Sequence, residues 1–311
     1  MPMLDGHRFQ NFERAAGDVT GEQVVKVVER HSSVLFFTES RVVKVFLSEP
    51  PERTAMRFEW LAGHGMLDCR LEHFGSASER LGVIVMERLP EKCSLWALLS
   101  GTSVELDHID RLIDRVDVIQ RRVGTSPVPA EVVAVGMVEN IAKQARLLAE
   151  DRLARVAGRV WRVGRVITSA MRSSGAAWTP VVHGDLHSAN VFVLPGHVAI
   201  IDPVFTEPRA RVAPYFTELA PLYADALVLG RRDVVGRIEE HFLGGSHSDR
   251  WDVFQLAVCL KVLVRYRVAA HSRMVEPDRS RRSSDDWCSD TVLVGRLVDT
   301  VLAELAVDVA D

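Results

Sequence analysis

Residues 181–203 read VVHGDLHSANVFVLPGHVAIIDP, and this stretch decides the fold. It begins with a short apolar run and a turn, in which Gly184 permits a tight backbone. Val191–Leu194 is typical of a strand, Pro195-Gly196 of a turn, and Val198–Ile201 of the returning strand. The sequence therefore predicts a loop followed by a β-hairpin.

Three polar side chains accompany this hairpin. Asn190 precedes its first arm and Asp202 follows its second, so antiparallel pairing places them side by side. Two hard oxygen ligands suit Mg²⁺, which takes the rest of its shell from water and substrate phosphates. Asp185, in the preceding loop, is placed to accept a hydroxyl proton. The ordered set indicates phosphate transfer from Mg²⁺-bound ATP to a hydroxyl; the alternative is a capped turn with a solvated hairpin.

The motif HGDLHSAN, followed by IID, resembles the catalytic and metal loops of the aminoglycoside phosphotransferase and choline kinase family. These small-molecule kinases share the protein-kinase fold, in which one loop supplies an Asp and an Asn and a second loop supplies another Asp. The resemblance implies that Asp185 is the catalytic base. It also implies that Asn190 and Asp202 hold Mg²⁺.

The same resemblance implies an α+β, two-lobed, protein-kinase-like fold. We expect residues 1–90 to form a small antiparallel sheet lobe with one helix, at residues 52–63, which binds the nucleotide. Met56, Trp60 and Leu61 are expected on the inward face of that helix. Residues 91–311 are expected to form a larger, mainly helical lobe with the catalytic hairpin and the substrate pocket, and ATP is expected between the lobes.

A kinase-like fold requires a lysine in the first lobe that holds the α- and β-phosphates of ATP. Ser33–Thr38 and Val42–Leu47 predict two strands of a hairpin, with Lys44 in the middle of the second. A lysine within an apolar strand costs desolvation free energy unless it is paired. Glu59, fifteen residues further on, is the expected ion-pair partner, and Glu52, at the start of the same helix, is the weaker candidate. The alternative is that both side chains face solvent.

The resemblance also locates further nucleotide contacts. Val83–Val85 predicts a buried strand, after which the chain should form the hinge between the lobes. Met86 takes the gatekeeper position, and backbone groups of Glu87 and Leu89 are expected to bond the edge of adenine. Ser33 lies in a turn without glycine; it is a candidate phosphate contact or, alternatively, a turn cap. The missing glycine-rich loop argues against an ordinary protein kinase.

Two later segments complete the pattern. Glu218 stands near the place where the family has an Asp-Leu-Ala segment, at an imperfect offset, so we expect it to be structural. Residues 256–270 are the most apolar stretch but contain Lys261, Arg265 and Arg267, which favours a buried or amphipathic helix over a membrane span. Apolar stripes predict other helices at residues 137–153, 156–171, 221–229, 234–242, 251–270 and 290–307.

Composition limits the partners and the location of the protein. The chain has 311 residues, 47% of them apolar, and a net charge of −4, so no general attraction to nucleic acid is expected. Its start lacks the apolar segment of a secretory signal, and four scattered cysteines suggest reduced thiols. We expect a cytoplasmic monomer or homodimer that does not bind membranes.

The resulting hypothesis is an ATP-dependent O-phosphotransferase acting on a small hydroxylated molecule. The leading expectation is inactivation of an aminoglycoside, nucleoside or other hydroxylated antibiotic, and hence antibiotic resistance. Residues 203–311 hold 14 basic and 17 acidic residues, so the acidic pocket that a polycation requires is not evident. The alternatives are a kinase of a metabolic sugar, choline or amino alcohol, a catalytically silent binding module, and a metal hydrolase using His183, Asp185 and His187.

Overall fold

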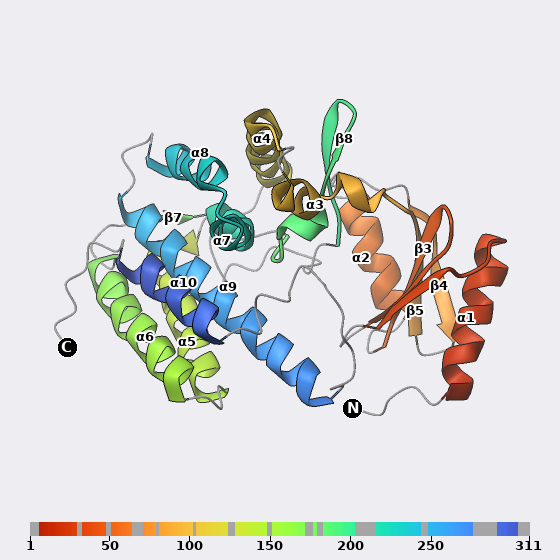
Figure 1. Ribbon diagram of the computed structural model, residues 1–311, viewed down its shortest axis with the longest axis horizontal. Coiled ribbons are helices and arrows are strands. Elements are labelled where there is room, and N and C mark those ends of the chain that lie inside the picture. Colours follow the sequence, from red (N-terminus) through yellow and green to blue (C-terminus); the bar gives the residue numbers. More distant parts are fainter. Residues whose placement is uncertain are drawn as a thin grey trace. The chain divides into compact units, whose positions relative to one another are not determined.

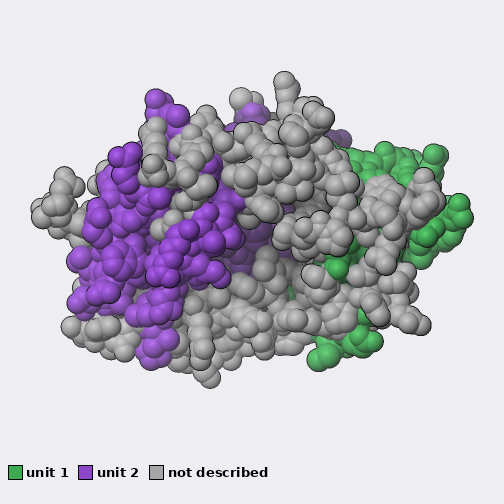
Figure 2. Space-filling model, turned by 90° about the horizontal axis from the view of Figure 1, so that it is seen from below, with its two compact units in different colours: residues 1–91, 199–201 green, residues 92–198, 202–311 purple. Residues whose placement is uncertain are grey.

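The computed structural model describes residues 6–29, 33–47, 51–63, 71–78, 81–101, 104–123, 128–147, 151–171, 177–178, 183–202, 215–243, 248–275 and 291–303. The chain divides into two compact units. Unit 1 comprises Met1–Glu91 and Ala199–Ile201, and unit 2 comprises Lys92–Val198 and Asp202–Asp311 (Figure 2). Unit 1 is organised around a sheet and unit 2 around helices.

Unit 1 contains an antiparallel five-stranded sheet with the strand order β1-β2-β3-β5-β4. Its elements are α1 (Gly6–Thr20), β1 (Lys26–Glu29), β2 (Ser33–Phe37), β3 (Arg41–Phe46), α2 (Pro51–Gly63), β4 (Leu71–Ser78) and β5 (Leu81–Glu87). β2 and β3 form the predicted hairpin, in which Lys44 lies opposite Leu35. On the other side of β3, Lys44 lies opposite Ile84 of β5. Lys44 is therefore in the central strand of the sheet.

The two faces of this sheet are covered by different helices (Figure 1). Side chains alternate along a strand, so Val43 and Val45 point to one face while Lys44 and Phe46 point to the other. Val43 and Val45 belong to an apolar core with Phe12 of α1, so α1 covers the first face. This N-terminal helix was not predicted, and unit 1 has two helices where the sequence led us to expect one.

Helix α2 packs on the second face of the sheet. The ring of Phe58 lies 6.1 Å from the ring of Phe46, measured between centroids. Thr54 approaches Gly82 of β5 so closely that a Cβ at position 82 would stand 2.0 Å from the Thr54 hydroxyl oxygen. Glycine at this position thus allows the helix to contact the strand directly.

The inward side of α2 agrees with the prediction at Leu61 but not at Met56. Thr54, Phe58 and Leu61 are buried and follow the i, i+4, i+7 spacing of one helix face. Met56 is 70% exposed, so its predicted inward position is wrong. The side chain of Trp60 lies outside the described atoms. Thr54 explains the error at Met56. Hydropathy favours methionine over threonine as a buried residue, but the contact of Thr54 with Gly82 turns the Thr54 side of the helix toward the sheet.

Unit 2 is mainly helical, with two short two-stranded sheets, β6-β7 and β8-β9. Its elements are α3 (Leu95–Ser100), α4 (Leu106–Val123), β6 (Val128–Pro129), α5 (Ala130–Leu147), α6 (Asp151–Met171), β7 (Ala177–Trp178), the 3₁₀ helix η2 (Ser188–Asn190), β8 (Val191–Leu194), β9 (His197–Ile200), the 3₁₀ helix η3 (Tyr215–Leu219), α7 (Ala220–Val228), α8 (Arg232–Leu243), α9 (Ser248–Val275) and α10 (Thr291–Ala303). Two elements span the division between the units: β9, whose residues Ala199 and Ile200 count with unit 1, and a further 3₁₀ helix, η1 (Glu91–Cys93).

The long helix α9 organises the core of unit 2 and packs against α5, α6, α7 and α10 (Figure 1). At Gly164 of α6, an added Cβ would stand 2.7 Å from the side chain of Val138 and 3.7 Å from that of Leu256, so three helices meet there. Val253–Leu260 is buried along its whole length. No described helix combines the length and apolar character that a membrane crossing requires.

The two helices before the catalytic loop were predicted with the wrong boundaries. The structure has α5 at Ala130–Leu147 and α6 at Asp151–Met171, so the helix break falls before residue 151. The prediction extended the first helix to residue 153 because Leu153 continues an apolar stripe. Leu153 is indeed fully buried, but in the first turn of α6.

Candidate active site

Residues 183–190 form a loop that leads into β8 and carries the proposed base, Asp185. The side chain of Asp185 is 40% exposed, whereas Ser188 and Asn190 close to it are buried. Gly184 has a φ of 84°, which is the left-handed region that glycine adopts without strain. A reachable carboxylate thus stands on a largely buried loop.

The first anchor of this loop is Glu218, a residue of η3 that is only 4% exposed. Its carboxylate accepts hydrogen bonds from the backbone N–H of His183 at 2.5 Å and of Gly184 at 2.9 Å. Bonds of N–H groups to a charged acceptor are stronger than neutral ones. The structural role of Glu218 is therefore to fix the backbone just before Asp185.

The second anchor is Asp225 of α7, which is fully buried. One carboxylate oxygen accepts the backbone N–H of Ser188 at 3.0 Å and the Ser188 hydroxyl at 2.6 Å. The other oxygen pairs with the guanidinium of Arg265 at 2.7 Å. Arg265 neutralises this carboxylate, which would otherwise be very costly to bury. The loop is thus held on both sides of Asp185.

A third contact comes from Lys261 of α9, whose ammonium donates a hydrogen bond to the carbonyl oxygen of Gly184. Sequence reasoning assigned no site role to Lys261 or Arg265, and it considered Asp225 only as a possible member of an acidic cluster for a cationic substrate. A signal was nevertheless present, because Lys261 and Arg265 interrupt the most apolar stretch of the chain. Charges in a buried helix require partners, and here Lys261 bonds the 183–190 loop directly while Arg265 reaches it through Asp225.

Asn190 and Asp202 lie at the same end of the β8–β9 hairpin, because residues 195–196 form its turn. The side-chain amide nitrogen of Asn190 donates to the carbonyl oxygen of Asp185 at 3.0 Å, which orients the amide oxygen away from that bond. Asp202 has a φ of 58°, the only positive φ of a non-glycine residue in the described ranges. Such backbone strain is found preferentially at functional sites.

The donor set of these two residues fits Mg²⁺. An amide oxygen and a carboxylate are hard ligands, and a magnesium site with two protein ligands is completed by water and phosphate. Among the described residues, no three His, Cys, Asp or Glu side chains gather as a metal site. His183, Asp185 and His187, which are all described, therefore do not form such a cluster in this structure.

Both histidines of the loop brace its backbone through their Nδ1 atoms. Nδ1 of His183 accepts the N–H of Asp185 at 3.2 Å, and Nδ1 of His187 accepts the N–H of Ala189 at 3.3 Å. Nε2 of His187 lies 3.9 Å from a carboxylate oxygen of Asp185.

In unit 1, the structure places Lys44, Ser33 and Met86 on one face of the sheet. Ser33 lies opposite Phe46, and Met86 lies opposite Val42, two residues on either side of Lys44. Lys44 is 7% exposed, and its ammonium lies 5.2 Å from the centre of the Phe46 ring, a cation–π distance. Ser33 is 3% exposed. These three candidates for nucleotide binding therefore share one surface.

The hinge segment follows directly after β5. Glu87 is exposed and Leu89 is half-buried. The N–H of Arg88, between them, donates to the carbonyl oxygen of Ser40 at 2.8 Å. Backbone groups alternate in direction along a strand, so the N–H and C=O groups of Glu87, the last residue of β5, point away from β3. This is the orientation that bonding to the edge of a base requires.

Glu59 is not brought to Lys44. It lies on the exposed side of α2, next to buried Phe58, and no hydrogen bond or salt bridge joins it to any described residue. Adjacent helical positions are separated by about 100° around the axis. The proposed ion pair would therefore require α2 to turn.

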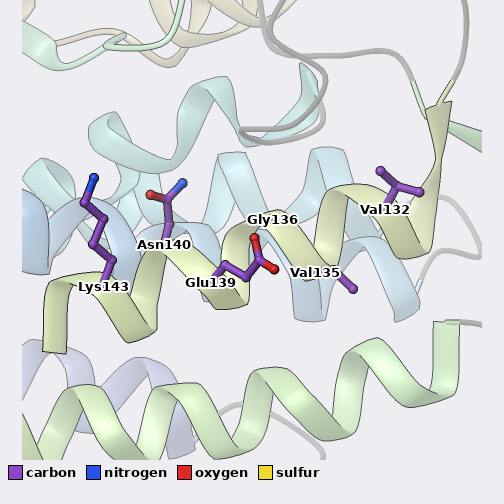
Figure 3. A pocket seen from close by; sticks show the side chains of 6 residues that line it. All are labelled: Val132, Val135, Gly136, Glu139, Asn140 and Lys143. Carbon is purple, nitrogen blue, oxygen red and sulfur yellow. The ribbon is translucent and has the colours of Figure 1, made fainter. Parts of the chain in front are cut away.

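A separate groove of about 390 Å³ follows one side of α5 (Figure 3). It is lined by Val132, Val135, Gly136, Glu139, Asn140 and Lys143. Its one carboxylate and one ammonium balance each other in charge. None of the residues proposed for catalysis or nucleotide binding lines it.

Comparison with solved structures identifies the class of fold, which is that of small-molecule kinases. The fold inferred from the motif is thereby confirmed as protein-kinase-like. No protein-family model matches the sequence, and comparison with curated proteins finds no match.

Three similar structures show the extent of the likeness. A thermostable mutant of aminoglycoside phosphotransferase APH(4)-Ia, in a ternary complex with AMP-PNP and hygromycin B, has a TM-score of 0.58 and 14% identity over 94% of this chain and 98% of its own. A choline/ethanolamine kinase family protein from Mesorhizobium loti has a TM-score of 0.52 and 11% identity over 91% and 88%. Glucosamine kinase, with glucosamine, ADP and phosphate, has a TM-score of 0.50 and 17% identity over 91% and 76%.

Proposed function

We propose that this chain is an ATP-dependent O-phosphotransferase that moves the γ-phosphate of ATP to a hydroxyl group of a small molecule. The main support is the catalytic loop, where the carboxylate of Asp185 is accessible while Glu218 and Asp225 hold the backbone on either side. A general base must be both within reach of its proton and fixed in orientation. This loop meets both requirements.

In the proposed reaction, the acceptor hydroxyl gives its proton to Asp185 as its oxygen forms a bond with the γ-phosphorus. The bond between the γ-phosphorus and the β,γ-bridging oxygen breaks, and ADP leaves with the electron pair. The products are the phosphorylated acceptor and ADP. Asp185 then releases its proton to solvent.

Other residues would bind and orient the nucleotide. Asn190 and Asp202 would hold Mg²⁺, which when bound neutralises charge on the phosphates. The ammonium of Lys44 would hold the α- and β-phosphates, with Ser33 as a further phosphate contact. Glu59 would orient Lys44 in a form of unit 1 in which α2 has turned.

The adenine would be bound by the hinge. The backbone groups of Glu87, which point away from β3, and those of Leu89 would bond the edge of the base, and Met86 would act as gatekeeper. Half-buried Leu35 and Phe37 share a face with Lys44, so an apolar surface is available for a purine ring.

For the acceptor, we propose a hydroxylated antibiotic, so that phosphorylation would confer resistance. The similar structures have hygromycin B or glucosamine bound, which are both hydroxylated small molecules. The near balance of charge over residues 203–311 favours a nucleoside or other weakly charged antibiotic over a polycation. A metabolic sugar, choline or amino alcohol is the second candidate.

The test is a phosphate-transfer screen with Mg²⁺-ATP and acceptors from each class: aminoglycosides, nucleoside antibiotics, sugars and amino alcohols. Replacing Asp185 with alanine should lower kcat by about 10²- to 10⁴-fold, the usual contribution of a general base, while ATP still binds. Asp114→Ala, which removes an exposed aspartate of α4, is the matched control and should leave kcat unchanged. ATP binding without turnover on any acceptor would instead indicate a catalytically silent binding module.

A further inference from the structure

Helix α9 carries two cations within a stretch that is otherwise apolar. Lys261 and Arg265 are separated by four residues and therefore lie on one side of the helix. The neighbouring residues Val262 and Leu263 are fully buried in the core of unit 2. Cations in such surroundings are retained at a cost in desolvation, so their partners indicate what they do.

The partner of Lys261 is the residue that precedes the proposed base. Gly184 is the most flexible point of the loop, because it lacks a Cβ and has a φ of 84°. Its N–H donates to Glu218, and its carbonyl oxygen accepts from Lys261. Both polar groups of this glycine are therefore fixed by charged side chains, and the peptide that leads into Asp185 cannot rotate without breaking one of the bonds.

The partner of Arg265 acts on the other side of the base. Arg265 pairs with Asp225, and the same carboxylate accepts the N–H and the hydroxyl of Ser188. The side chain of Arg265 is 11% exposed and that of Asp225 is fully buried. Ser188 lies three residues after Asp185, so this second connection fixes the far end of the segment that carries the carboxylate.

We infer that Lys261 and Arg265 are positioning residues for the proposed phosphate transfer. Two cations on successive turns of α9 hold Gly184 directly and Ser188 through Asp225, and together they set the position of Asp185. The catalytic consequence rests on the proposed function, whereas the restraint on the loop does not. A displacement of about 1 Å in a reacting group can cost roughly 100-fold in rate, so such a restraint matters for turnover.

The experiment compares Lys261→Met with Lys261→Arg and with Lys143→Met, which removes an exposed lysine of α5. Amide hydrogen exchange of the peptide covering residues 183–190 reports the restraint, and Mg²⁺-ATP turnover reports catalysis. In Lys261→Met we expect faster exchange in this peptide and a kcat lowered roughly 10- to 100-fold, with KM for ATP unchanged. Lys261→Arg keeps a cationic donor and should recover most of both losses, and Lys143→Met should match the wild type.

The second connection is tested with Ser188→Ala, which keeps Arg265 and Asp225 paired and so avoids a buried unpaired charge. It removes the hydroxyl bond to Asp225 and should raise exchange in the same peptide, with a smaller loss of kcat.

The outcomes separate the two proposals. Unchanged exchange in both Lys261→Met and Ser188→Ala would overturn the positioning role, whatever happens to turnover. Faster exchange in a protein whose wild type transfers no phosphate would retain the restraint and reject the proposed function. A loss of kcat equal in Lys261→Met and Lys261→Arg, without a change in exchange, would also overturn the inference.

Discussion

The catalytic loop of unit 2 and helix α2 of unit 1 each carry a residue proposed for catalysis, but they are held by different forces. Around Asp185, buried charges bind backbone groups: Glu218 and Asp225 accept, and Lys261 donates. Around Glu59, Phe58 packs against Phe46, and the carboxylate faces solvent. The proposed base therefore lies on a segment held by charged side chains, whereas Glu59 would have to be carried to Lys44 by a rotation of α2.

The largest effect is expected in the charged network of unit 2. Asp225→Ala leaves the guanidinium of Arg265 buried without its partner and the N–H of Ser188 without its acceptor. Breaking a buried pair in this way should lower the free energy of unfolding by about 3–5 kcal/mol. Chemical denaturation of the purified variant measures the loss, and a change under 1 kcal/mol would show that the pair is not buried in solution.

The corresponding change in unit 1 acts on packing. In Gly82→Ala, the new methyl group would overlap the Thr54 hydroxyl, and α2 must shift away from β5. Overpacking of this kind costs about 1–3 kcal/mol, which denaturation also measures. The double variant Gly82→Ala with Thr54→Ala provides the control, because it removes the overlapping hydroxyl and should recover part of the loss.

A pH-dependent effect is expected at Glu22, which ties the β2–β3 turn to the segment after α1. Hydrogen bonds from the Ser40 hydroxyl, first of all, and from Thr38 and the Ser40 N–H, together with the charge of Arg41, lower the pKa of Glu22 from 4.5 to about 2. Because the pKa is lower in the folded protein than in the unfolded chain, the ionised carboxylate stabilises the fold at pH values above about 4.5. This contribution is lost as the pH falls from about 4.5 toward 2.

Glu22→Gln tests this assignment by denaturation over a pH series. The difference in stability between wild type and variant should be constant from pH 6 upward and shrink below pH 4.5. A difference that does not depend on pH would mean that the carboxylate is not held in the folded state.

The smallest effect on stability is expected from Glu59→Gln. The side chain is exposed, so the free energy of unfolding should change by no more than about 0.5 kcal/mol. Turnover with Mg²⁺-ATP is the sharper measurement, because a loss of kcat from this surface change would show that α2 turns Glu59 toward Lys44 during the reaction. Full turnover would assign the orientation of Lys44 to another group, and Glu52→Gln, at the start of α2, would then test the weaker candidate.

The sequence predicted those parts of the structure in which local pattern and tertiary packing agree. The β2–β3 hairpin around Lys44, the hairpin from Val191 to Ile200 and most helices of unit 2 follow from strand alternation, turn residues and apolar stripes. The kinase-like fold follows from one ordered motif, because few other arrangements of Asp185, Asn190 and Asp202 suit a common chemistry. The roles of these residues in catalysis stay predictions.

Local pattern failed where contacts distant in sequence decide the outcome. Helix α1 was missed because its core contact through Phe12 depends on a sheet face that is not apparent without strand order. Met56 was predicted to face inward because threonine is polar and Thr54 was therefore expected to face solvent. Gly82, which lies opposite Thr54, leaves room for the threonine side chain to be buried. The connection from Lys261 to Gly184 spans 77 residues, so only the unexplained charge in an apolar helix indicated that a partner was needed.

The contact of three helices at Gly164 has a practical consequence for the enzyme that we propose. Leu256 of α9 packs there, little more than one turn before Lys261. Warming that loosens the helical bundle should therefore disturb the base at the same time, and loss of turnover should coincide with melting of the bundle even if the sheet unit is still intact. Heat-resistant variants selected by activity alone would then be expected to carry their substitutions along the interior of α5, α6 and α9.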